Sequence, residues 1–206
     1  MTKILLIRHG HVEGIHSERF RGREPLALTR RGQAEAEAVA GRISTEWRPA
    51  CVYTSPMERC VKTADAISQA CGMPAAELCE DLNDLDYGVW QFKTFADAET
   101  DNQQLFNAWF ATPHLVRFPG GESLQDVAAR AANALRLIIA RHPNQIIVLV
   151  GHDSINRTLL LQFLDLPLSS YWRIEQWPCC VNEVDITDGE VRVYRINETY
   201  HLVQVD

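Results

Sequence analysis

Two short apolar runs in this chain each end almost directly at a histidine. Residues 3–7 (KILLI) precede His9 by one arginine, and residues 146–150 (IIVLV) precede His152 by one glycine. Apolar runs of this length, bounded by glycine, are typical of strands buried on both faces. Ligands of open α/β sheets bind beyond the carboxyl ends of the strands, so we expect both histidines at one functional edge.

Amphipathic helical patterns separate the apolar runs. The run Ser123-x-x-Asp126 is typical of a capping box at the start of one helix, and Ser55 followed by proline indicates the start of another. We expect helices over 29–47, 55–72, 123–139 and 152–164, a further strand over 51–54, and a hairpin over 179–196. This order predicts an α/β fold, a three-layer α/β/α sandwich with a mostly parallel sheet and an antiparallel edge. Residues 1–206 contain no linker or repeat, so we expect a single domain.

Composition narrows the functional classes. The net charge of −7 argues against nucleic acid as a partner, yet residues 1–31 carry a surplus of four positive charges, which suits a small anion. No apolar run is long enough for a signal peptide or a membrane span, so we expect a cytoplasmic protein that does not bind membranes. We therefore expect free thiols at the six cysteines, with Cys179 and Cys180 buried in a strand.

The neighbours of the two histidines are arginines. Arg8 adjoins His9, and Arg59 lies near the start of the helix that follows strand 51–54. The planar guanidinium group of arginine matches phosphate oxygens bidentately, so two histidines with two arginines favour a phosphate site over a metal site. For Arg59 alone, an exposed position on a helix is the alternative.

Five segments in order resemble the signature of the histidine phosphatase superfamily, which includes the cofactor-dependent phosphoglycerate mutases. They are RHG at 8–10, RFRG at 19–22 with LALT at 26–29, SPMER at 55–59, PGGES at 119–123 and GH at 151–152. The resemblance implies a phosphoglycerate mutase-like fold and a small phosphorylated substrate. It also implies catalysis without a metal or cofactor.

The resemblance also implies roles for individual residues. Neutral His9 would attack phosphorus and form a phosphohistidine, while Arg8, Arg59 and His152, the last as an imidazolium, would stabilise the transferring oxygens. The phosphate-binding and substrate-binding residues would be Arg8, Arg21, Gly22, Arg59 and His152.

The proton donor is where the sequence departs from the family. The usual glutamate falls on Asp84, whose carboxyl group must be carried about 1.5 Å closer by the backbone because aspartate is one methylene shorter. Asp86, Glu80 and Asp81 are alternatives. A third interpretation is that the eight acidic residues of segment 77–101 form only a solvated face.

Two further features concern the pocket. The family's asparagine after RHG has no counterpart, since Ile15 or His16 falls there, and Arg21 stands where a smaller polar residue is common. Arg21 either binds an anionic group of the substrate or is a surface charge. The aromatic residues of segment 90–118 indicate a helical excursion, for which core packing is favoured over a lid.

We predict a metal-independent phosphomonoesterase of the histidine acid phosphatase type. Only 31 residues separate Gly88 from Gly120, which favours hydrolysis over mutase-type phosphoryl transfer with a closing lid. A catalytically weak, phosphate-binding regulatory protein is an alternative because the acid position has changed, and a metal hydrolase ranks last. The sequence leaves open the substrate and the oligomeric state, for which a homodimer is one option.

Overall fold

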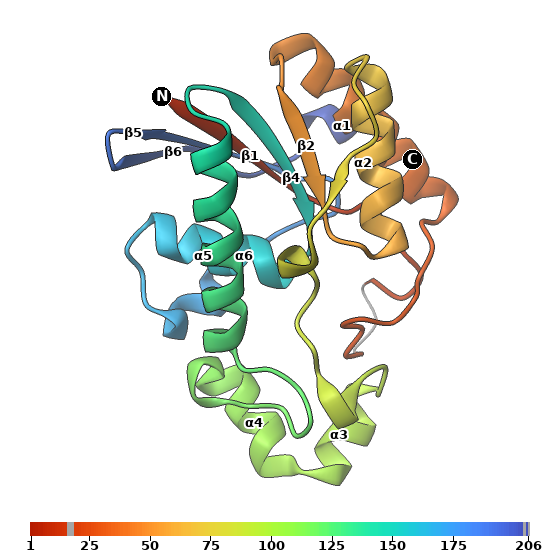
Figure 1. Ribbon diagram of the computed structural model, residues 1–206. Helices are drawn as coiled ribbons and strands as arrows, with labels where there is room; N and C mark the ends of the chain where they lie inside the picture. Colours follow the sequence, from red (N-terminus) through yellow and green to blue (C-terminus); the bar gives the residue numbers. More distant parts are fainter. Residues whose placement is uncertain (16–18, 204, 206) are drawn as a thin grey trace.

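A six-stranded sheet lies at the centre of the computed structural model, which describes residues 1–15, 19–203 and 205 (Figure 1). The strand order is β3-β2-β4-β1-β5-β6. The strands are β1 (Thr2–Arg8), β2 (Cys51–Thr54), β3 (Glu77–Leu78), β4 (Ile146–Gly151), β5 (Val181–Thr187) and β6 (Glu190–Glu198). The first four are mutually parallel, whereas β5 pairs antiparallel with β1 and with β6. The predicted mostly parallel sheet with an antiparallel edge is confirmed.

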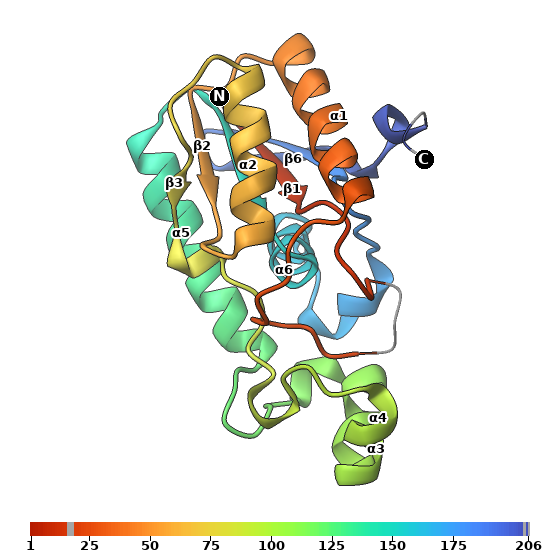
Figure 2. The ribbon, with the colours of Figure 1, turned by 90° about the vertical axis from the view of Figure 1, so that its right-hand side faces the viewer.

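Helices cover both faces of the sheet, which confirms the three-layer architecture (Figure 2). The long helices are α1 (Arg30–Glu46), α2 (Glu58–Ala70), α5 (Leu124–Arg141) and α6 (Asp153–Phe163). Side chains of β1 alternate between the faces: Leu5 and Ile7 pack with α1 and α2, whereas Ile4 and Leu6 pack with α5 and α6. In the described residues, no helix is long and apolar enough to cross a membrane.

Of the two helix-start signals predicted from the sequence, one is confirmed. The Thr29 hydroxyl caps α1, and Ser123 and Asp126 form the predicted capping box of α5. Ser55 does not cap α2, which begins at Glu58 without a side-chain cap. The prediction was wrong: the Ser55 hydroxyl accepts from the Met57 N–H at 3.3 Å, before the helix begins, and lies 2.8 Å from a ring nitrogen of His152.

The six cysteines are free thiols, as predicted. Cys179 and Cys180 are fully buried, but they lie in the turn before β5, not in a strand. The residue Cys179 has a φ of +50°, which is outside the extended region, so the strand starts only at Val181.

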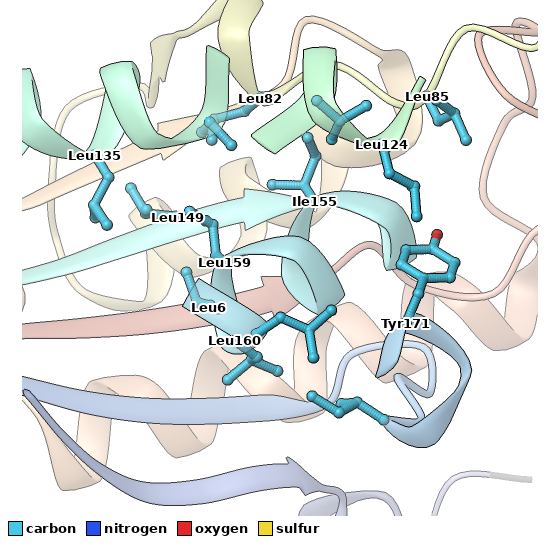
Figure 3. Close-up of a cluster of buried hydrophobic side chains, with 14 of the residues drawn as sticks. Leu6, Leu82, Leu85, Leu124, Leu135, Leu149, Ile155, Leu159, Leu160 and Tyr171 are labelled. Carbon is cyan, nitrogen blue, oxygen red and sulfur yellow. The ribbon is translucent and has the colours of Figure 1, made fainter. Parts of the chain in front are cut away.

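The aromatic segment forms a helical excursion beyond the carboxyl ends of the parallel strands (Figure 1). It contains α3 (Phe95–Asp101) and α4 (Gln103–Ala111). Trp90, Trp109 and Phe118 are each at most 2% exposed and belong to the same cluster of buried side chains as α5 and α6. Core packing is confirmed for these three, whereas Phe92 and Phe110 are exposed. Figure 3 shows another part of this cluster. Short 3₁₀ turns occur at Glu80–Leu82, Gly88–Trp90, Pro113–Leu115, Leu168–Arg173 and Tyr200–Leu202.

Candidate active site

The two histidines are neighbours at the carboxyl edge of the sheet. Arg8 and Gly151 are paired in the β1–β4 register, so the residue that follows each strand lies beside the other. The ring centroids of His9 and His152 are 5.3 Å apart, and the planes meet at 64°. The predicted adjacency is confirmed.

His9 is held as a neutral imidazole with one nitrogen available. Its Nδ1 lies 2.8 Å from the carbonyl oxygen of Gly10, which can only accept, so Nδ1 carries the proton and Nε2 holds the lone pair. Burial, followed by the positive charge of Arg59, holds the pKa of His9 well below its ordinary value. The ring is therefore an unprotonated nucleophile at neutral pH.

Arg59 is fixed by several contacts at the start of α2, and it is only 1% exposed rather than an exposed helix residue. Its guanidinium group donates to the carbonyl oxygens of Gly22 at 2.6 Å and Glu24 at 2.9 Å. The same Nη2 lies 3.2 Å from Asp84 Oδ2 and 3.2 Å from His152 Nδ1. Arg59 thus contacts both the carboxyl group of Asp84 and the imidazole ring of His152.

Arg8 lies beside His9 with part of its guanidinium group uncommitted. Its Nη1 donates to the carbonyl oxygen of Gln176, while its buried Nε has no hydrogen-bond partner in the described structure. A buried N–H group without a partner is costly, so this donor favours an anion in the adjacent pocket.

The surroundings of His152 disfavour the imidazolium form that the resemblance implies for phosphoryl transfer. Its Nδ1 lies 3.2 Å from Arg59 Nη2 and 3.4 Å from Asp84 Oδ2, and its Nε2 lies 2.8 Å from the Ser55 hydroxyl oxygen. Burial, and then the charges of Arg59 and Arg8, hold the pKa of His152 well below its usual value. Its role as an imidazolium beside a transferring phosphoryl group stays a prediction.

Asp84 is the acidic residue of segment 77–101 that lines the same pocket as His9. Its Oδ1 accepts hydrogen bonds from the Ser154 hydroxyl at 2.6 Å and the Leu85 backbone N–H at 2.9 Å. Asp86, by contrast, accepts from the backbone of Gly88 and faces Arg23. Glu80 and Asp81 do not line the pocket. The geometry therefore favours Asp84 among the four acidic candidates.

The pocket has polar walls on both sides of His9. Described residues that line it are Arg8, His9, Val12, Arg19, Arg21, Gly22, Arg59, Asp84, Tyr87, Asp153 and Ser154. Arg21 faces this pocket rather than being only a surface charge, and burial together with Arg8 lowers its pKa. Gly22, at φ +45°, acts through its carbonyl, which accepts from Arg59. Ile15 is buried, and His16 lies outside the described residues.

Sequence reasoning missed five polar residues in or beside the pocket: Arg19, Ser55, Tyr87, Asp153 and Ser154. Ser55 directly follows β2, and Asp153 and Ser154 are the first two residues of α6, just after β4. Their position after the strands was the signal that could have identified these three. Within the described residues, no group of three or more His, Cys, Asp or Glu side chains is arranged to hold a metal ion.

A family profile described as "Histidine phosphatase superfamily (branch 1)" matches residues 4–199. The chain belongs to the histidine phosphatase superfamily. The match includes both histidines, both arginines and Asp84.

Two named phosphatases and one solved structure are similar to this chain, at sequence identities of 26% to 29%. Phosphoserine phosphatase 1 of Hydrogenobacter thermophilus is 29% identical over 203 residues, which are 98% of this chain and 95% of that protein. The metal-independent phosphoserine phosphatase of Arabidopsis thaliana is 29% identical over 79% of this chain and 68% of its own length. The solved structure of Bacillus stearothermophilus YhfR superposes with a TM-score of 0.92 at 26% identity, covering 98% of this chain and all of that one.

Proposed function

We propose that this chain is a phosphomonoester hydrolase that forms a phosphohistidine at His9. The observation that carries the proposal is the neutral His9 ring, whose Nε2 is unprotonated and whose pocket also contains Arg8 and Arg59. A nucleophile surrounded by cationic donors suits a dianionic phosphoryl group. Family membership and the names of the relatives support the same reaction class.

In the first step, His9 Nε2 attacks phosphorus and the P–O bond to the alcohol breaks. Asp84, in its protonated form, gives its proton to the leaving alkoxide oxygen. Arg8 and Arg59 stabilise the phosphoryl oxygens. The negative charge of the phosphoryl group favours protonation of His152, so this ring becomes a better donor when substrate is bound.

In the second step, a water molecule takes the place of the departed alcohol. Asp84, now a carboxylate, removes a proton from this water as it attacks phosphorus, and the N–P bond to His9 breaks. Inorganic phosphate leaves and His9 returns to its neutral state. Of the two carboxyl oxygens of Asp84, Oδ1 accepts from Ser154 and Leu85, and Oδ2 lies 3.2 Å from Arg59 Nη2.

The substrate in this proposal is a small phosphorylated metabolite with a second charged group. Arg19, Arg21 and Asp153 line the same pocket as His9 and provide charges of both signs. The two phosphoserine phosphatases among the relatives support a substrate that combines a phosphate with other charged groups. We further propose a cytoplasmic protein whose 206 residues form one catalytic domain.

The experiment is a panel of small phosphate monoesters assayed at several pH values with excess chelator, on the intact protein and on His9→Ala. Hydrolysis that resists the chelator and disappears in His9→Ala supports the proposal. His142→Ala is a matched control, because this histidine is at the end of α5, before β4 begins, and its side chain is bonded to Tyr53 and Gln145. Binding of the esters without turnover by the intact protein would instead indicate a regulatory phosphate-binding protein.

A further inference from the structure

The segment that carries Asp84 has irregular backbone. It lies between the 3₁₀ turns Glu80–Leu82 and Gly88–Trp90, and no strand pairs with it. Leu82 and Leu85, on either side of the acid, are buried in the same cluster as Leu124 (Figure 3). Carbonyl groups between these two anchors need donors from elsewhere in the chain.

Arg130, on α5, donates to three backbone carbonyl groups in and just before this segment. Its Nη1 donates to the carbonyl oxygens of Asp81 and Asn83, both at 2.7 Å, and its Nη2 donates to that of Asp84 at 3.0 Å. The Arg130 side chain is 15% exposed, so water competes little with these bonds. One guanidinium group therefore holds three backbone positions at and before the proposed acid.

Glu122, from the PGGES segment, links Arg130 to the backbone of Asp86, which follows Asp84 in the loop. It accepts from Arg130 Nε at 2.8 Å and Nη2 at 3.0 Å, and it also accepts from the backbone N–H of Asp86 at 3.0 Å. Arg23 completes the network by donating to Glu122 at 3.1 Å and to the Asp84 carbonyl at 3.0 Å. The backbone of residues 81–86 is thus held on both sides of Asp84.

We propose that Arg130, supported by Glu122, is a positioning residue that fixes the backbone of Asp84 for proton transfer. An aspartate reaches its carboxyl group through one side-chain torsion fewer than a glutamate, so the backbone largely decides where its oxygens lie. The proposal rests on the proposed role of Asp84 as acid and base. Arg130 itself does not line the pocket and is distinct from the phosphate-binding arginines.

This role predicts a dependence on the leaving group. An alkyl alkoxide needs the proton from Asp84, whereas p-nitrophenolate leaves without it. Displacement of Asp84 by loss of Arg130 should therefore slow phosphorylation of His9 by an alkyl ester about 10- to 100-fold, part of the typical contribution of a general acid. Phosphorylation by p-nitrophenyl phosphate should change less than about threefold, because the proposed phosphate-binding residues Arg8 and Arg59 are held by the carbonyl oxygens of Gln176 and Gly22 and not by Arg130.

The experiment measures rapid-quench phosphorylation rates with both esters for Arg130→Lys, Arg130→Gln and Glu122→Gln. Arg136→Ala is the matched control, because Arg136 is an exposed arginine on the same helix whose side chain bonds Asn133. The inhibition constant of inorganic phosphate should stay within about threefold of the intact protein. Glu122→Gln keeps the positioning role testable if the Arg130 variants do not accumulate as soluble protein.

Selective loss with the alkyl ester supports the proposal. Equal loss with both esters, or no loss with either, overturns it, because a purely structural role would not distinguish the leaving groups. Asp84→Asn separates the two proposals. If Asp84→Asn discriminates between the esters and the Arg130 and Glu122 variants do not, only the positioning role is wrong; if Asp84→Asn does not discriminate, the role of the acid fails and the positioning role fails with it.

Discussion

Acidification should destabilise this protein through its active-site histidines. Burial is the main cause that holds the pKa values of His9 and His152 well below their ordinary value, and burial also lowers the pKa of His201. In the unfolded chain these rings take up protons near pH 6.5, whereas in the folded protein they do not. The unfolded state thus binds more protons below pH 6.5, so the free energy of unfolding falls as the pH falls.

The size of the effect can be worked out for His152 alone. Suppose that the ring stays neutral in the folded state and has a pKa of about 6.5 in the unfolded state. Lowering the pH from 7 to 5.5 then reduces the free energy of unfolding by about 1 kcal/mol. Carboxylates with lowered pKa values act at lower pH: Asp126, for example, has a pKa of about 2 because the Ser123 hydroxyl and backbone donate to it. The window from pH 7 to 5.5 therefore reports mainly on histidines.

The assay is urea unfolding at pH 7 and pH 5.5 for the intact protein and for His152→Gln. The packing lost with the imidazole is common to both pH values and cancels when the two free energies of unfolding are subtracted. The intact protein should lose about 1 kcal/mol more than His152→Gln over this interval. An equal loss in both proteins, or a smaller loss in the intact protein, would refute the argument that His152 is buried as a neutral ring.

Three further predictions concern the scaffold of the site. Ser123→Ala removes the capping box with Asp126 and should lower the free energy of unfolding by about 1 kcal/mol, measured by urea titration. Trp109→Ala empties a buried position of the aromatic cluster and should cost about 3–5 kcal/mol in the same assay; a loss below 1 kcal/mol would favour a mobile lid. In Gly121→Ala, the new Cβ would lie 2.4 Å from the Asp86 carbonyl oxygen, so thermal unfolding should show a loss of about 1–3 kcal/mol; unchanged stability would contradict this close approach.

Much of the fold could be predicted because its signals are local. The apolar runs 3–7 and 146–150 became β1 and β4, since strands covered on both faces need an uninterrupted apolar sequence. Ser123 and Asp126 marked the start of α5 through hydrogen bonds that span only three residues. The carboxyl-edge rule then brought His9 and His152 together without any knowledge of their contacts.

What could not be predicted depends on contacts between distant parts of the chain. Ser55 looked like a helix cap because serine before proline often is one, but its hydroxyl lies at the His152 ring, 97 positions away. The protonation of His152 depends on complete burial, which no local pattern reveals. Arg130 gave no signal either, because on α5 it has the spacing of an ordinary polar helix residue while its side chain reaches the carbonyls of the acidic loop.

The most direct test of the proposed phosphatase is detection of the phosphorylated residue. The intact protein and Asp84→Asn would be mixed with p-nitrophenyl phosphate, quenched at alkaline pH where phosphohistidine survives, digested, and analysed by fragmentation mass spectrometry. We predict one phosphoryl group on His9, with more of it in Asp84→Asn because hydrolysis of the intermediate slows. Turnover without any phosphorylated His9, or with the phosphoryl group on another residue such as His11 or His152, would contradict the mechanism.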